Sequence, residues 1–332
     1  MIGSAAVAPP VATRTMRAAR IAAAGRARVE AVPIPAPGPG TVRVRLEGSG
    51  VCASNLPVWE GRDWFSYPQE PGAPGHEGWG IIDAVGADVR DLEVGQRVAA
   101  LSYHAYAEHD IAAGDAVVPL PAALAGIPFP GEPLGCAINV IRRSEITAGQ
   151  TVVIVGIGFL GALLTRLASG AGARVIAVSR RPFALDVARQ SGADVTIPMD
   201  DHWRTIERVR ALTGGVGAER VIEAVGLQWP LDLAGELTCE RGRLIIAGFH
   251  QDGPRQVNVQ LWNWRGLDVI NAHERDPRTY VEGMAAAVDA VASGVLDPGP
   301  LITHRFPLEQ LGTAMRLTAE RPDGFLKALV EV

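Results

Sequence analysis

The sequence is poor in cysteine: its three cysteines in 332 residues are too few for a disulfide framework. It contains no block of basic residues, and 31 Lys and Arg against 36 Asp and Glu argue against a nucleic-acid partner. The most apolar uncharged stretch, 152–165, is too short to cross a bilayer. No basic residue precedes Arg14, unlike a secretory signal, so we interpret residues 1–15 as a disordered tail and expect a cytoplasmic protein.

Two patterns divide the rest of the chain, whose length suits two domains. Up to about residue 134, short alternating runs such as 41–46 and frequent Pro/Gly turns predict a β-rich domain. Further on, apolar runs alternate with helical segments, which indicates a parallel sheet covered on both faces. The expected strands are 151–155, 174–178, 221–225, 243–247 and 267–270, and the expected helices include 162–171 and 182–190.

The segment from residue 300, with a last helix at 308–321, is too short to stand alone, and we expect it to rejoin the first domain. The prediction is therefore an α/β protein. A β-rich domain of residues 16–137 and 293–332 wraps around a doubly wound parallel-sheet domain of residues 138–292.

A glycine-rich turn lies between the first predicted parallel strand and its helix. Gly156, Gly158 and Gly161, with Phe159 and Leu160 between them, give the spacing G-x-G-x-x-G. In this context the glycines permit a tight turn, close approach of a pyrophosphate, and close packing of helix on strand. The phosphates would lie at the helix N-terminus, so we predict a nicotinamide dinucleotide site.

The end of the next strand indicates which dinucleotide is bound. An acidic residue about twenty positions after the glycines would bind the ribose 2′-hydroxyl of NAD. Here that place holds Ser179, followed by Arg180 and Arg181. A hydroxyl and guanidinium groups suit a 2′-phosphate, so we predict NADP(H), although two loop arginines can also simply be solvated.

Three metal-ligating residue types fall in or next to the β-rich part: Cys52, His76 in a glycine-flanked loop, and Cys136. Two thiolates and an imidazole form a catalytic zinc set with an open fourth position. The residues alone leave two interpretations open: a zinc site, or cysteines whose thiols pack as small apolar groups.

The order of these motifs resembles the zinc-dependent medium-chain dehydrogenase/reductase family, which is alcohol dehydrogenase-like. The resemblance covers nearly the whole chain from Met16 and includes three further motifs, 95–99, 217–226 and 325–330. It implies a GroES-like catalytic domain, a Rossmann domain and an active site between them. It also implies zinc ligands Cys52, His76 and Cys136, with Glu77 able to approach the metal. Val225 and Gly248 are further candidate cofactor contacts.

The chain also departs from the family pattern. A lobe with four closely spaced cysteines for a structural zinc is missing, so one catalytic Zn²⁺ is expected. Ser54 keeps the hydroxyl for the substrate oxygen and the proton relay. Asn55 replaces an Asp that orients the histidine, and we expect its amide to accept the imidazole N–H. Pro57 replaces a relay histidine, so the proton must leave by another route.

The resemblance implies hydride transfer between NADP(H) and a small alcohol or carbonyl compound, such as a secondary alcohol, polyol or sugar derivative. Trp59, Trp64 and Tyr106 are candidate lining residues of the substrate pocket, or else core. We expect a homodimer or homotetramer formed through the Rossmann domain, with no membrane partner. Two alternatives stay open: a zinc-independent enoyl or quinone reductase, and a non-catalytic NADP(H)-binding protein.

Overall fold

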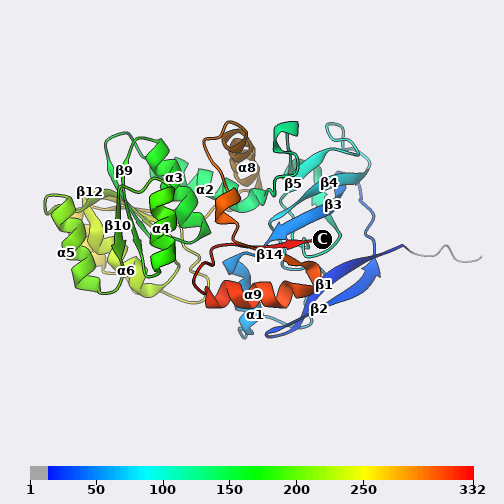
Figure 1. Ribbon diagram of the computed structural model, residues 1–332, viewed down its shortest axis with the longest axis horizontal. Coiled ribbons are helices and arrows are strands. Elements are labelled where there is room, and N and C mark those ends of the chain that lie inside the picture. The colour runs from blue at the N-terminus through cyan, green and yellow to red at the C-terminus, as the bar shows by residue number, and fades with distance from the viewer. Residues whose placement is uncertain (1–13) are drawn as a thin grey trace, which may run out of the picture.

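The computed structural model describes residues 14–332, so the predicted tail lies outside the described residues up to residue 13. Thr15 already begins strand β1 (Thr15–Ala23), which pairs antiparallel with β2 (Arg26–Pro33). Two larger sheets lie toward opposite ends of the long axis of the molecule, with α2 and α8 between them (Figure 1). Within residues 14–332, no helix has the length and apolar character needed to cross a membrane.

The first large sheet belongs to the β-rich domain and is mainly antiparallel. Along β3, Val42, Val44 and Leu46 are buried while the arginines between them face outward, as the alternation predicts. β15 pairs with β3, so the C-terminal segment contributes a strand to this sheet. The strands are β14 (His304–Pro307), β15 (Ala328–Glu331), β3 (Thr41–Gly50), β4 (Gly78–Val85), β5 (Arg97–Ala100), β7 (Val117–Pro119) and, beside β3, β6 (His109–Ala113).

Helices in this domain are short, apart from the last one. They are α1 (Leu56–Glu60), α9 (Leu311–Glu320) and the 3-10 turns η1 (Ala53–Asn55), η2 (Gly114–Ala116), η3 (Ala122–Leu124), η4 (Gly299–Leu301) and η5 (Leu308–Gln310). The predicted helix 308–321 is thus a 3-10 turn followed by α9.

The second sheet is parallel throughout, with strand order β10-β9-β8-β11-β12-β13. Its strands are β8 (Thr151–Val155), β9 (Arg174–Ser179), β10 (Val195–Pro198), β11 (Ala218–Glu223), β12 (Thr238–Ile246) and β13 (Asp268–Asn271). The helices around it are α2 (Gly131–Ser144), α3 (Phe159–Gly170), α4 (Pro182–Gln190), α5 (His202–Leu212), α6 (Gln228–Leu237), α7 (Val259–Arg265) and α8 (Pro277–Ala292).

Both faces of this sheet are buried, which confirms the doubly wound prediction. Alternate residues of β8 pack in opposite directions. Val152 and Ile154 join the core with α2, α3, α4 and α8, whereas Val153 and Val155 join the core with α5 and α6. The reversal of strand order lies between β8 and β11, and ligands of such sheets bind at the carboxyl ends of the strands at that point.

Candidate active site

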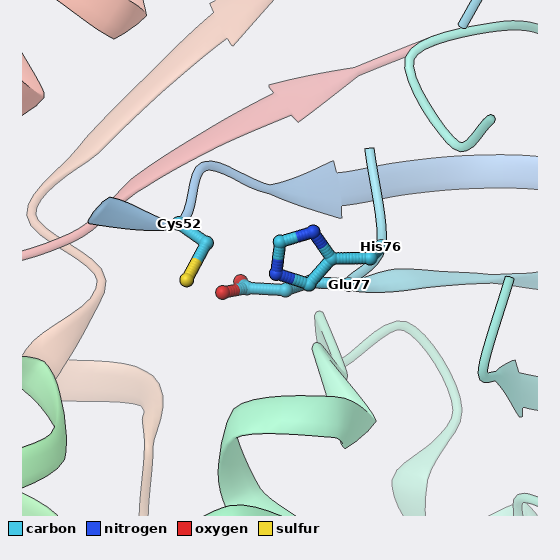
Figure 2. Close-up of side chains that lie close together, drawn as sticks. All are labelled: Cys52, His76 and Glu77. Atoms are coloured by element: carbon cyan, nitrogen blue, oxygen red, sulfur yellow. The ribbon is translucent and has the colours of Figure 1, made fainter. Parts of the chain in front are cut away.

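Three metal-ligating side chains converge at the ends of β3 and β4. Cys52 follows β3, and His76 and Glu77 directly precede β4. Figure 2 shows the thiol, the imidazole and the carboxylate pointing toward one another, and their candidate ligand atoms all lie within 4.8 Å of one another. Because β3 and β4 are antiparallel neighbours, the end of one strand lies beside the start of the other. This pairing brings together residues 24 positions apart.

The ring of His76 is fixed by a backbone carbonyl. Its Nδ1 lies 2.9 Å from the Pro74 carbonyl oxygen, which can only accept, so Nδ1 carries the proton. Nε2 then faces the cluster, 3.4 Å from the Ser54 hydroxyl. Burial lowers the pKa of His76, but the hydrogen bond and negative charge of Cys52 outweigh it and raise that pKa to about 10.

Asn55 supports this ring differently from our expectation. Its Nδ2 donates to the Pro74 carbonyl at 3.3 Å and lies 3.4 Å from His76 Nδ1, while its Oδ1 accepts from the Tyr106 hydroxyl at 2.7 Å. The predicted acceptor of the imidazole N–H was therefore wrong: the Pro74 carbonyl accepts it. Tyr106 is 0% exposed, so it supports Asn55 from within the core and does not line an open substrate pocket.

Glu77 is paired with a lysine from the C-terminal strand region. Lys327 Nζ donates to Glu77 Oε1 at 2.6 Å and lies 2.5 Å from Oε2, with the side chains 6% and 0% exposed. The same ammonium donates to the Val51 carbonyl at 3.2 Å and lies 5.0 Å from the centroid of the Phe159 ring. Phe159 is the first residue of α3, so Lys327 lies between the cluster and the glycine turn.

The first turns of α2 contribute two further groups. The Cys136 thiol donates to Glu132 Oε1 at 3.1 Å and is not part of the 4.8 Å cluster. The Glu132 carboxylate lies near enough to the cluster for its charge to raise the pKa of His76. Sequence reasoning placed Cys136 at the metal and missed Glu132, although the spacing of four residues on one helix face signalled that the two lie together.

The glycine turn has the geometry of a dinucleotide site. Gly156 has a φ of +100°, and a Cβ there would lie 2.2 Å from Val225. A Cβ on Gly161 would lie 2.0 Å from the Gly156 carbonyl oxygen. At Gly158, the residue before α3, a Cβ would meet nothing within 4 Å, so open space lies over the helix N-terminus. Anions are favoured at such a terminus because its N–H groups are free.

The three residues predicted to bind the 2′-phosphate differ in their exposure to solvent. Ser179 ends β9 and is buried, and Arg180 is exposed. The guanidinium of Arg181, however, donates through Nη1 to the Phe325 carbonyl oxygen at 2.6 Å. One of the two arginines therefore links the β9 end to the catalytic domain.

A buried network that sequence reasoning missed fixes the loops after β11 and β12. Glu223 is 0% exposed, and its carboxylate accepts from the N–H groups of Val225 and Gly226 at 2.7 and 2.8 Å. His250 Nε2 lies 2.8 Å from the other oxygen, and Arg255 Nε donates to His250 Nδ1 at 3.1 Å. This turn ends β11 at residue 223, earlier than predicted. A glutamate inside an apolar strand was the available signal.

The remaining candidate pocket residues are the tryptophans. Trp59 packs against the core of the catalytic domain and lies under Gly312 of α9. Trp64 is 57% exposed, and its ring is tilted by 43° relative to the ring of Phe65, with the two centroids 6.0 Å apart. Of the three predicted pocket residues, Trp64 is the one whose ring is open to solvent.

The comparisons with known proteins agree with this architecture. Residues 38–135 match the alcohol dehydrogenase GroES-like domain, and residues 160–290 match the zinc-binding dehydrogenase domain. The chain belongs to the medium-chain dehydrogenase/reductase family of alcohol dehydrogenase-like proteins. It is an oxidoreductase of that type.

Several relatives of this chain bear the names of dehydrogenases. Erythritol/L-threitol dehydrogenase of Mycolicibacterium smegmatis is 28% identical over 86% of this chain and 89% of its own. 2-Dehydro-3-deoxy-L-galactonate 5-dehydrogenase of Pseudoalteromonas atlantica is 29% identical over 60% of this chain and 56% of its own. A solved zinc-binding dehydrogenase from Sinorhizobium meliloti, bound to NADP, superposes with a TM-score of 0.82 and 26% identity, covering 96% of this chain and 100% of its own.

Proposed function

We propose that this protein is a zinc-dependent dehydrogenase that transfers hydride between NADP(H) and a secondary alcohol or its ketone, of the polyol or sugar-derivative class. The observation that carries the proposal is the cluster of Cys52, His76 and Glu77 within 4.8 Å. Thiolate, imidazole and carboxylate are the zinc donors of proteins, so the residues present fit the ion. The substrate class is supported by the names of the sugar-acid and tetritol dehydrogenases that the chain resembles.

The protein's own residues supply placement and proton handling. Cys52 and His76 would hold the metal, with Glu77 beside them and the Cys136–Glu132 pair available from α2. When bound, zinc polarises the oxygen of the substrate and the nicotinamide exchanges the hydride. Ser54 lies 3.4 Å from His76 Nε2, so its hydroxyl can hold the substrate oxygen and pass a proton outward. Lys327 keeps the cluster and the glycine turn in a fixed relation.

The NADP(H) preference is tested by Ser179→Asp. A carboxylate at the end of β9 would repel a 2′-phosphate and accept a ribose hydroxyl instead. We expect the ratio of kcat/KM for NADPH to that for NADH to fall by about 10²-fold. This fall corresponds to about 2.7 kcal/mol of discrimination, at 1.36 kcal/mol for each factor of ten. Steady-state kinetics with both cofactors measures it. Wild-type enzyme that prefers NADH, or a variant with an unchanged ratio, would contradict the assignment.

We further propose that the protein is a dimer formed through its Rossmann domain. β13 is an edge strand of the parallel sheet, and Val269 on it is 37% exposed. Trp264, on the helix that precedes β13, is 85% exposed. Unpaired strand edges and large exposed apolar side chains favour association.

A further inference from the structure

Three arginines from two domains gather at the end of β9. Arg180 and Arg181 follow this strand, and Arg321 comes from the turn after α9 in the catalytic domain. The two turns are held together by the hydrogen bond from Arg181 Nη1 to the Phe325 carbonyl. This contact spans 144 positions of sequence and lies beside Ser179, where the ribose of a dinucleotide on the glycine turn would end.

The cluster carries more positive charge than its surroundings balance. Loss of water and the charge of Arg180 lower the pKa of the Arg321 guanidinium. Loss of water and the charge of Arg321 also lower the pKa of Arg181, and Asp323 is the acidic group that opposes this effect. An excess of positive charge of this kind favours an anion nearby.

The three guanidinium groups differ in what they have left to bind. Arg181 uses its Nη1 for the Phe325 carbonyl. Arg321 uses its Nε for the Thr318 carbonyl at 3.3 Å. Among residues 14–332, its Nη1 and Nη2 have no hydrogen-bond partner, and neither does the exposed side chain of Arg180. Unpartnered guanidinium N–H groups from both domains are therefore available near the end of β9.

We infer that Arg321 is a third ligand of the NADP(H) 2′-phosphate, acting from the catalytic domain opposite Ser179 and Arg180. The inference rests on the proposed NADP(H) function and extends it, because the sequence pattern assigned this phosphate to the Rossmann domain alone. In this arrangement Arg181 has a positioning role: it holds the turn of Arg321 against the end of β9. Selection of NADP(H) then depends on the two domains being docked.

The test is Arg321→Gly, because Arg321 has a φ of +48°, a left-handed conformation that glycine adopts without strain. Dissociation constants of NADPH and NADH are measured by fluorescence titration of the full-length protein. We expect the NADPH constant to rise at least tenfold, in line with the loss of a charge-assisted hydrogen bond, and the NADH constant to change less than twofold. Arg321→Lys should restore part of the NADPH affinity.

The matched control is Arg316→Ala on α9. The Arg316 side chain is exposed and pairs with Glu320. This variant should leave both constants unchanged. Equal weakening of NADPH and NADH by Arg321→Gly, or no weakening of either, would overturn the role of Arg321. If the wild-type protein binds NADH as tightly as NADPH, the NADP(H) proposal itself fails, and that result is visible before any variant is made.

Discussion

Replacing Cys52 by alanine should lower kcat/KM at least about 10³-fold while the protein stays folded. Its thiol lies in the cluster with His76 and Glu77, and a catalytic metal contributes several kcal/mol to stabilising charge on the reacting oxygen. Cys52 is only partly buried and follows the end of β3, so removal of its sulfur leaves little cavity. Steady-state kinetics with NADPH and a ketose or ketone panel measures the loss, and circular dichroism checks the fold.

Cys239→Ala is the matched control for that experiment. Cys239 is also a free, partly buried cysteine, but it lies on β12 with its Sγ near the Glu240 carbonyl. We expect full activity from this variant. A Cys52→Ala enzyme that keeps more than a tenth of the wild-type kcat/KM would remove the basis for metal-assisted hydride transfer.

Lys327→Met should have the largest effect on stability. It would leave the Glu77 carboxylate, which is 0% exposed, without its partner at 2.6 Å. Removing one member of a buried ion pair costs about 3–5 kcal/mol, because the remaining charge stays buried and uncompensated. Urea unfolding of the purified enzyme, with the midpoint and slope fitted together, gives the change in unfolding free energy.

The double variant Glu77→Gln with Lys327→Met separates charge from shape. Because it removes both charges, we expect it to recover at least half of the stability that Lys327→Met loses. A single variant within 1 kcal/mol of wild type, or a double variant less stable than Lys327→Met, would show that the pair does not act as a buried ion pair.

Local patterns predicted the Rossmann domain well. The bounds of β8 and α4 agree with the prediction to the residue, because a continuous apolar strand and a helix introduced by Pro182 leave few alternatives. The GroES-like domain was predicted only as β-rich. Its strand order depends on pairings such as β15 with β3, which join segments far apart in the sequence and leave no trace in local periodicity.

Only part of the candidate site was predicted, because here too the contacts join residues far apart in the sequence. Glycine and valine around Cys52 and His76 mark their loops, but the partners of these residues are distant. Lys327 and Glu77 are 250 positions apart, and Tyr106 reaches Asn55 across 51 positions. For Tyr106 the sequence left a pocket role and a core role both open, because an aromatic residue in an irregular segment gives no sign of whether it faces solvent or core; the structure places its ring in the core. Glu132 was passed over because a glutamate at a helix start usually serves as a favourable first-turn charge.

One buried carboxylate, that of Glu223, fixes the loops after β11 and β12. Glu223 accepts two backbone N–H groups and pairs with His250, so both loops are held at the carboxyl ends of the strands where a nicotinamide would lie. Both ring nitrogens of His250 have partners, Glu223 and Arg255, so this histidine has a structural role in these loops.

The central claim is that hydride is transferred to or from an oxygen held by zinc at Cys52 and His76. The most direct test is elemental analysis of the purified enzyme in parallel with activity, before and after dialysis against a chelator. The account predicts one zinc per chain in the wild type, loss of both zinc and activity on chelation, and no stoichiometric zinc in His76→Ala. Full activity of metal-free protein would contradict it and would favour a zinc-independent enoyl or quinone reductase.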